Sequence, residues 1–368
     1  MDINILNKKS ILVIVVLVVA IVLLYAGGAS SLFSGDKDSG YYTMEDYKKV
    51  EKIDAHMHMY TKKPEFLRKT KKENFRLVTI NTDMGMSITE QRDIALDQIN
   101  DFPGQISFAT TFSIKGKENP DWKKHTITYL DESFKKGAVA VKIWKNIGMS
   151  VKDTIGNFLM IDNPMFKPIF DFLVEHNKPV VFHIAEPKNC WLPLEEMTVK
   201  GDWDYFVIHP EYHMYLHPEY PSYEKLINAR DNAIAQNPEL KFVACHLASL
   251  EWDVDELAQR LDKFPNMAAD MAGRICHLQF QSKKDREKVR DFIIKYADKL
   301  LYGTDISVKD DYKFDTAHNV WLEDWRYFVT DDIMTSPDFE GEFRALKLPK
   351  NVIDKIFRNN AQKWYPDL

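Results

Sequence analysis

Short apolar runs alternate with longer amphipathic segments along most of the chain after residue 52. Short runs rich in β-branched residues favour buried strands, whereas apolar residues at three- and four-residue spacing favour helices. The pattern predicts strands over residues 53–59, 75–81, 105–111, 138–144, 179–185, 241–246, 266–271 and 299–304. It predicts helices over residues 89–102, 122–136, 163–176, 223–236, 252–264 and 282–297.

Repeated strand–helix units indicate an α/β fold with a parallel sheet. Eight such units over about 250 residues are typical of a (β/α)8 TIM barrel, which is the architecture that we predict. A doubly wound open sheet is the alternative. No G-x-G-x-x-G motif follows the first strand, which favours the barrel.

The first residues of the chain differ in character from the rest. Residues 11–26 form an uncharged apolar run that follows Lys8 and Lys9. Such a run is typical of a signal peptide or a signal anchor, and both interpretations stay open. We therefore predict a signal anchor or signal peptide over residues 1–29, a linker over residues 30–49 and the barrel over residues 50–368. The barrel is expected outside the cytosol, exported or membrane-anchored.

Two regions exceed what a minimal barrel needs. Residues 186–221 are rich in aromatic side chains and repeat His-Pro-Glu-Tyr at His209 and His217. A long loop after the fifth strand is expected to cover the working face of a barrel as a lid. Residues 310–342 carry ten acidic and two basic side chains, which predicts a solvated helical cap. Residues 348–364 are predicted to form one closing helix.

Composition narrows the class of protein. The chain has 368 residues, is 45% hydrophobic and carries a net charge of −6, which gives no support for nucleic-acid binding. Its three cysteines, Cys190, Cys245 and Cys276, lack C-x-x-C spacing, so neither a disulfide framework nor a zinc ribbon is predicted. Cys245 lies inside an apolar run and is expected to be a buried thiol.

The first predicted strand carries the strongest chemical signal. Strand alternation places Asp54, His56 and His58 on one face and the apolar residues of this strand on the other. Two imidazoles on one face of a strand are able to converge on one cation. The alternative is a pair of histidines that merely fit a half-buried strand.

Three more polar side chains close apolar strands. His183 lies near the end of the fifth strand, His246 ends the sixth, and Asp305 follows the eighth. In a parallel barrel, the carboxyl ends of the strands form the working face. Neutral imidazoles with one carboxylate suit one divalent metal, Zn²⁺ first and Mn²⁺ second.

The ordered set His56-x-His58, His183, His246 and Asp305 resembles the amidohydrolase superfamily of metal-dependent barrels. The chain is most similar to the amidohydrolase-2 branch, which includes aminocarboxymuconate-semialdehyde decarboxylase and related hydrolases. The resemblance covers residue 50 to the carboxyl terminus. It implies one metal held by His56, His58, His183 and Asp305, with Asp305 also serving as a catalytic residue. It implies that His246 is the general acid/base.

Lys142 leaves two interpretations open. Other branches of the superfamily carboxylate a lysine on the fourth strand to bridge two metals. The alternative is a buried lysine that pairs with Asp54 or a similar carboxylate. Trp144, Asn146 and Arg274 also fall near strand ends and are predicted to bind substrate, Arg274 through a substrate carboxylate or else in a rim salt bridge.

The sequence thus predicts a metal-dependent hydrolase that acts on a small-molecule amide, ester or lactone. A nonoxidative decarboxylase of a small unsaturated or aromatic carboxylic acid is the alternative, and a non-catalytic membrane-tethered binding module is a third hypothesis. The predicted partners are a small-molecule substrate and, through an uncleaved N-terminal segment, the membrane. A homo-oligomer is compatible with the sequence.

Overall fold

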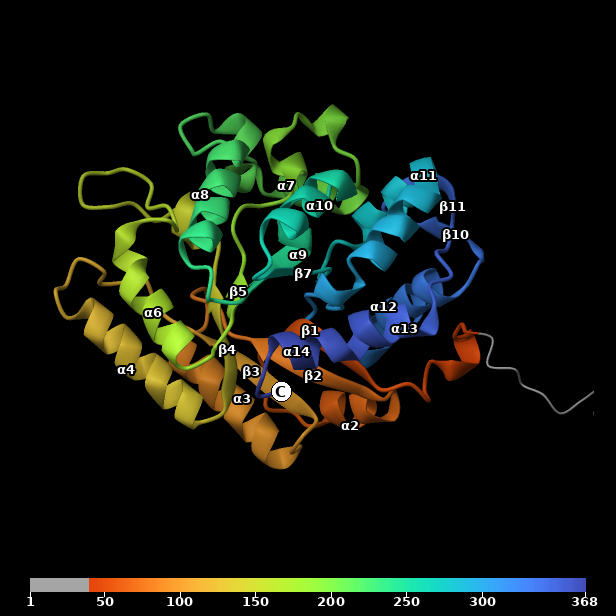
Figure 1. Cartoon of the computed structure of the whole chain (residues 1–368), viewed down its shortest axis with the longest axis horizontal. Helices are drawn as coiled ribbons and strands as arrows, with labels where there is room; N and C mark the ends of the chain where they lie inside the picture. Colours follow the sequence, from red (N-terminus) through yellow and green to blue (C-terminus); the bar gives the residue numbers. More distant parts are fainter. Residues whose placement is uncertain (1–39) are drawn as a thin grey trace, which may run out of the picture. The chain divides into compact units, whose positions relative to one another are not determined.

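The computed structural model describes residues 40–368 and contains an eight-stranded parallel sheet whose strands neighbour one another in chain order. This order confirms the α/β class and is consistent with a TIM barrel, and it excludes the doubly wound alternative (Figure 1). The strands are β1 (Lys52–Met59), β2 (Phe75–Ile80), β3 (Ile106–Thr111), β4 (Ala138–Ile143), β5 (Val180–Phe182), β6 (Phe242–Ala244), β7 (Met267–Asp270) and β8 (Leu300–Leu301).

Backbone hydrogen bonds join the two edges of this sheet. The amide of Ala55 in β1 donates to the carbonyl of Tyr302, just after β8, at 3.0 Å. The amide of His58 donates to the carbonyl of Ile306 at 2.8 Å, where β9 (Ser307–Val308) extends the pairing along β1. The last strand therefore returns to the first, as closure of a barrel requires.

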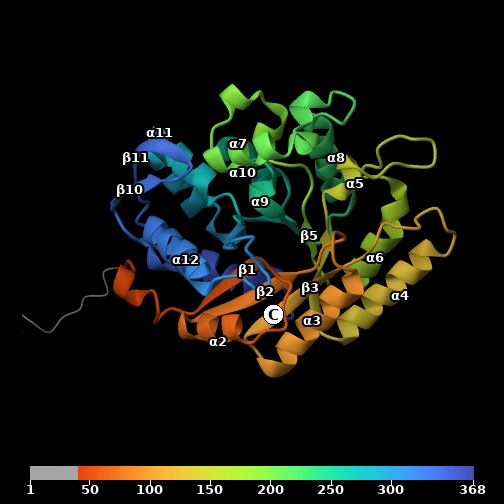
Figure 2. The ribbon, with the colours of Figure 1, turned by 180° about the vertical axis from the view of Figure 1, so that it is seen from behind.

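Helices follow the strands and cover the outside of the sheet (Figures 1 and 2). They are α2 (Glu65–Lys72), α3 (Ile88–Asp101), α4 (Trp122–Lys135), α6 (Lys167–Glu175), α8 (Tyr223–Gln236), α10 (Val254–Lys263) and α11 (Ile275–Lys295). Local chemistry fixes several starts, because the side chains of Ser87, Ser222 and Asp253 accept hydrogen bonds from the first turns of α3, α8 and α10. The six predicted helices are present. Helix α2 was not predicted, and α11 begins at Ile275 instead of residue 282.

The core has an inner and an outer part. The inner cluster is built from strand residues such as Ile53, Val181 and Leu301, and Trp364 and Tyr365 pack against it. These two aromatic residues come from the closing helix, which begins after Pro349 as predicted. It consists of α13 (Lys350–Asp354), a π-helical turn η8 (Lys355–Asn359) and α14 (Asn360–Trp364).

Strand β1 contains a bulge that the alternation pattern does not predict. Its pairing with β2 shifts register between Asp54 and Met57, so one extra residue lies in β1. Ala55 belongs to the inner cluster and Met57 to the outer one, whereas simple alternation puts both on the same face. Asp54 contacts Trp321 of α12 (Phe314–Val329), whose indole donates to the Asp54 carboxylate at 3.0 Å. The prediction that Asp54 shares a face with His56 and His58 is therefore wrong.

The two extra regions hold short elements. Residues 186–221 form a chain of 3-10 turns, η3 (Lys188–Trp191), η4 (Leu194–Glu196), η5 (Pro210–Tyr212) and η6 (Met214–Leu216), around α7 (Lys200–Ile208). Residues 310–342 contain α12 (Phe314–Val329) and most of an antiparallel pair, β10 (Ile333–Ser336) and β11 (Phe339–Arg344). The predicted helical cap is thus only partly helical. It is not solvated throughout, because Trp321 and Trp325 of α12 are fully buried.

The prediction of an exported or membrane-anchored protein is corrected. Within residues 40–368, no helix is long and apolar enough to cross a membrane. The longest of these helices, α11, carries a run of charged residues from Lys283 to Lys288. The apolar run at residues 11–26 and the predicted linker up to residue 39 lie outside the described residues.

Asp324 on α12 supplies a test of this packing. Burial raises the pKa of its carboxyl to about 7, against a hydrogen bond from the hydroxyl of Tyr302 at 2.7 Å. The folded state therefore keeps a proton that the unfolded state releases near pH 4. We expect the stability of the wild type to fall relative to that of Asp324→Asn by about 1.4 kcal/mol per pH unit between roughly pH 4 and 7.

Urea unfolding at a series of pH values measures this difference. Glu323→Gln, an exposed neighbour on the same helix, is the matched control and should give a curve parallel to that of the wild type. Parallel curves for Asp324→Asn as well would contradict a protonated Asp324 in the native state.

Candidate functional site

A pocket opens at the carboxyl ends of the strands. Its volume is about 310 Å³, and its walls include His58, Lys142, Trp144, His183, His246 and Asp305. These side chains come from β1, from the end of β4 and from the segments that directly follow β5, β6 and β8, so five separate parts of the chain meet there. Four of the five predicted histidine and aspartate positions line this pocket, and the fifth, His56, lies directly beneath it within ion-pairing distance of Asp305.

His56 and His58 both turn inward because of the bulge in β1, and both rings are anchored through Nδ1. His56 Nδ1 lies 2.8 Å from a carboxylate oxygen of Asp270, and His58 Nδ1 lies 2.6 Å from the carbonyl oxygen of Ile80. Because these oxygens only accept hydrogen bonds, each Nδ1 must be the donor. The second nitrogen, Nε2, is therefore an acceptor in the neutral ring and a donor when the ring is protonated.

Asp305 places a carboxylate oxygen against these two acceptors. Its Oδ1 lies 3.1 Å from His58 Nε2 and 3.5 Å from His56 Nε2. Burial acts to raise the pKa of Asp305, but His246, His58 and His56, which attract the carboxylate when they carry a proton, outweigh it and hold the pKa well below its usual range. Three electron-pair donors thus converge, an arrangement that a bound cation satisfies.

His183 and His246 form the second half of the site. Their ring centroids lie 4.2 Å apart, and Nε2 of His183 is buried without a hydrogen-bond partner among the described residues. His246 Nδ1 donates to the carbonyl of Ala272 at 2.7 Å, which leaves its Nε2 as the acceptor. Burial lowers the pKa of His246 to about 3, so the ring is neutral at pH 7.

Asp270, at the end of β7, organises this centre. Besides His56 Nδ1, its carboxylate accepts the backbone amide of His246 at 2.8 Å and that of Ala272 at 3.2 Å. Burial opposes ionisation, yet His56 and His246 lower the pKa of Asp270 to about 2. The sequence reveals only an acidic residue at the end of an apolar strand, which marks the position without giving this role.

The loops that carry the site are strained. His246, Leu247, Ala248 and Ser249 all have left-handed backbone angles, with φ between 52° and 60°, and Asp305 has φ of 63°. Such angles cost a non-glycine residue of the order of 1–3 kcal/mol each. Hydrogen bonds hold the turn, among them that of the Ser249 hydroxyl to the carbonyl of Ile184 at 2.8 Å. This turn explains why β6 ends before His246.

Lys142 does not pair with Asp54, in contrast to one predicted interpretation. The bulge takes Asp54 away from the barrel interior, where Thr304 donates to it from its hydroxyl at 2.6 Å. Lys142 Nζ instead lies 3.0 Å from Cys245 Sγ and 3.5 Å from His56 Nε2. Cys245 is the buried thiol that the sequence predicts, with 1% exposure.

The predicted substrate-binding residues are dispersed. Trp144 lines the pocket, but Asn146 does not, and its amide lies 3.3 Å from a carboxylate oxygen of Asp83. Arg274 lines a neighbouring cavity that shares Asp305 and Tyr205 with the pocket. Its Nε is buried without a partner within residues 40–368, and it forms no rim salt bridge there.

Residues 186–221 contribute aromatic side chains to the pocket, namely Tyr205 and Tyr212. The histidines of this region have local partners instead. His209 lies 3.3 Å from a carboxylate oxygen of Glu211, and His213 and His217 contact the carbonyls of Leu192 and Pro210. None of the three lies among the metal-competent groups found within the described residues.

Two groups of side chains have donor atoms within 4.8 Å of one another, as a metal site requires. One consists of His56, His58 and Asp305, and the other of His56, Cys245 and His246. His183 belongs to neither group, although its unpartnered Nε2 borders the same pocket. The chemistry of the first group, two imidazoles and a carboxylate, fits a divalent metal such as zinc.

Comparison with known proteins finds a matching protein family and similar solved structures. Residues 118–366 match the family model described as amidohydrolase. Among solved structures, 2,6-dihydroxybenzoate decarboxylase from Rhizobium is similar at 13% identity over 86% of this chain and 98% of that chain, with a TM-score of 0.50. For 4-oxalomesaconate hydratase from Rhodopseudomonas palustris, the identity is 13%, the coverage 86% and 96%, and the TM-score 0.46. No curated protein matches.

The role of Asp270 can be tested through zinc affinity. Truncation by Asp270→Ala removes the acceptor that orients His56, and we expect zinc to bind about 10- to 100-fold more weakly. Competition with a chelating dye measures the dissociation constant. Asp324→Ala, which removes an equally buried carboxylate that contacts Tyr302, should leave the affinity nearly unchanged. An equal loss in both variants would indicate general destabilisation and not lost orientation.

Proposed function

The chain belongs to the amidohydrolase family, and we propose that it is a metal-dependent hydrolase acting on an amide, ester or lactone bond of a small molecule. Members of this family are metal-dependent enzymes. One observation in this structure supports the proposal most directly. The Nε2 atoms of His56 and His58 face the same oxygen of the Asp305 carboxylate at 3.5 and 3.1 Å, so two imidazoles and a carboxylate converge on one point.

In this proposal His56, His58, His183 and Asp305 hold one divalent ion, with zinc as first choice and manganese as second. The unpartnered Nε2 of His183 supports its inclusion, because a buried ring nitrogen without a partner is costly unless a ligand satisfies it. When bound, the ion would supply Lewis acidity and a water that ionises near pH 7.

His246 would move the proton. Its Nδ1 is committed to the Ala272 carbonyl, so Nε2 is the atom that accepts a proton from the attacking water and returns it to the leaving group. The hydrogen bond from its backbone amide to Asp270 fixes the position of the ring. Asp305 would act both as a ligand and, through its unshared oxygen, as a second acceptor for the water.

Substrate contacts would come from several directions. Trp144, Tyr205 and Tyr212 offer flat apolar surfaces in the pocket, which suits an apolar or aromatic substrate part. Arg274 would reach a polar or anionic substrate group from the neighbouring cavity, since its Nε has no partner within the described chain. Asn146, predicted to bind substrate, does not line the pocket, so we assign it instead the positioning of the adjoining loop through Asp83.

Metal content tests the assignment of roles. We expect one metal per chain in the wild type and its loss in His183→Ala, because a ligand is removed. His246→Asn should retain the metal while its turnover falls by about 10²- to 10⁴-fold, the usual contribution of a general acid/base. His217→Ala, which alters an exposed histidine of residues 186–221, should change neither. Two metals per wild-type chain as purified, without added metal, would overturn the role given to His246.

A substrate panel tests the reaction. Esters, lactones and amides with aromatic or unsaturated parts should be hydrolysed, with release of an acid that pH-stat titration records. Aromatic and unsaturated carboxylic acids are tested in parallel for release of carbon dioxide. Release of carbon dioxide without any hydrolysis would contradict the hydrolase and support the nonoxidative decarboxylase. If the metal-loaded protein catalyses neither reaction, the hypothesis of a non-catalytic binding module is the one that is supported.

A further inference from the structure

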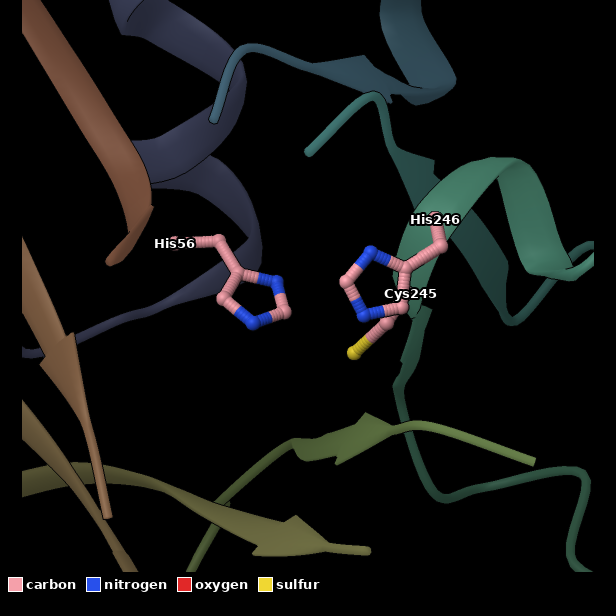
Figure 3. A group of neighbouring side chains, drawn as sticks. All are labelled: His56, Cys245 and His246. Carbon is pink, nitrogen blue, oxygen red and sulfur yellow. The ribbon is translucent and has the colours of Figure 1, made fainter. Parts of the chain in front are cut away.

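The thiol of Cys245 lies beside two imidazoles of the site. Cys245 follows β6 directly, and its side chain is almost fully buried. Figure 3 shows its sulfur atom and the rings of His56 and His246 turned toward the same space. Each residue offers one donor atom within 4.8 Å of the other two. One sulfur and two nitrogens make a softer donor set than the His56, His58 and Asp305 set.

The two donor sets share His56. Its Nδ1 is bound to Asp270, so Nε2 is the one nitrogen that it offers to either set. A single lone pair binds one metal ion at a time, so a second ion in the sulfur-containing set takes His56 from the first ion, which His58, His183 and Asp305 would still hold. The second ion would also engage His246, the proposed proton carrier.

A positive charge already lies among these donors. Lys142 Nζ is 3.0 Å from Cys245 Sγ and 3.5 Å from His56 Nε2, and it is 1% exposed. No carboxylate within residues 40–368 forms an ion pair with it. The Lys142 ammonium group therefore contacts a thiol and an imidazole, and no counter-ion neutralises its charge. This is an unfavourable environment for a buried cation. Lys142 also lines the pocket, so its side chain has space to withdraw.

We propose that His56, Cys245 and His246 form a second site for a thiophilic divalent cation of the zinc class, which the Lys142 ammonium guards. Binding forms a metal–sulfur bond as the Cys245 thiol releases its proton to solvent, and Lys142 moves toward the pocket. Occupation of this site removes His56 from the other donor set and engages His246, the proposed proton carrier. Excess zinc would then inhibit the enzyme. The second site follows from the geometry of its donor atoms and is independent of which reaction the enzyme catalyses.

Cobalt absorption tests the proposal, because a thiolate-to-cobalt charge-transfer band in the near ultraviolet appears only with sulfur ligation. The metal-free full chain is titrated with Co²⁺. In the wild type, we expect the band beyond the first equivalent, and in Cys245→Ala none. In Lys142→Met, the band should appear at a Co²⁺ concentration at least about tenfold lower than in the wild type, because a repelling charge has been removed. Cys190→Ala, which removes a different buried thiol, should retain the band.

The outcomes separate clearly. Absence of the band from the wild type and from Lys142→Met at saturating Co²⁺ would overturn the site, as would its persistence in Cys245→Ala. Where Lys142→Met does not fold, the comparison of wild type with Cys245→Ala decides alone. The proposed hydrolase activity is tested separately, by turnover on the substrate panel. The absence of turnover would contradict that activity without changing the absorption band.

Discussion

The hydrogen bonds of the Asp270 carboxylate hold the centre of this molecule together. It is fully buried and joins the ring of His56 on β1, the backbone of His246 after β6 and the backbone of Ala272 after β7. A buried carboxylate that lacks partners is strongly unfavourable, so each of these bonds compensates for its desolvation. The same bonds set which nitrogen of His56 faces the pocket, and thus decide where a cation can bind.

Most of the barrel could be predicted from local sequence. Strands buried on both sides are continuous apolar runs, and the eight runs are interrupted by helices of ordinary length. Because a barrel gathers the carboxyl ends of its strands, the positions of His183, His246 and Asp305 in the chain were enough to bring them to one face. The gathering of these residues follows from topology, whereas their ligand roles stay a prediction.

What could not be predicted depends on contacts between distant segments. The bulge in β1 is a matter of register with β2 and with the residues after β8, and it reverses the faces of Asp54 and Ala55. One error follows from another, because the expected pairing of Lys142 with Asp54 required Asp54 to face inward. The orientations of Asn146 and Arg274 depend on irregular loops, whose side-chain directions have no sequence period.

The bulge and the left-handed turn after β6 bring an excess of electron-pair donors into the barrel. His58, His183, His246 and the Asp305 carboxylate border one pocket, and Nε2 of His56 faces Asp305 beside it. Two lysines also line this pocket, Lys142 and Lys145, and Lys145 is paired with Glu186. Buried acceptors without donors destabilise a fold. A cation that satisfies them binds the folded chain and not the unfolded one, so its binding energy adds to the stability of the barrel. The strained turn destabilises the fold but positions the donor atoms that a metal needs. Metal binding therefore offsets part of the free-energy cost of this strain.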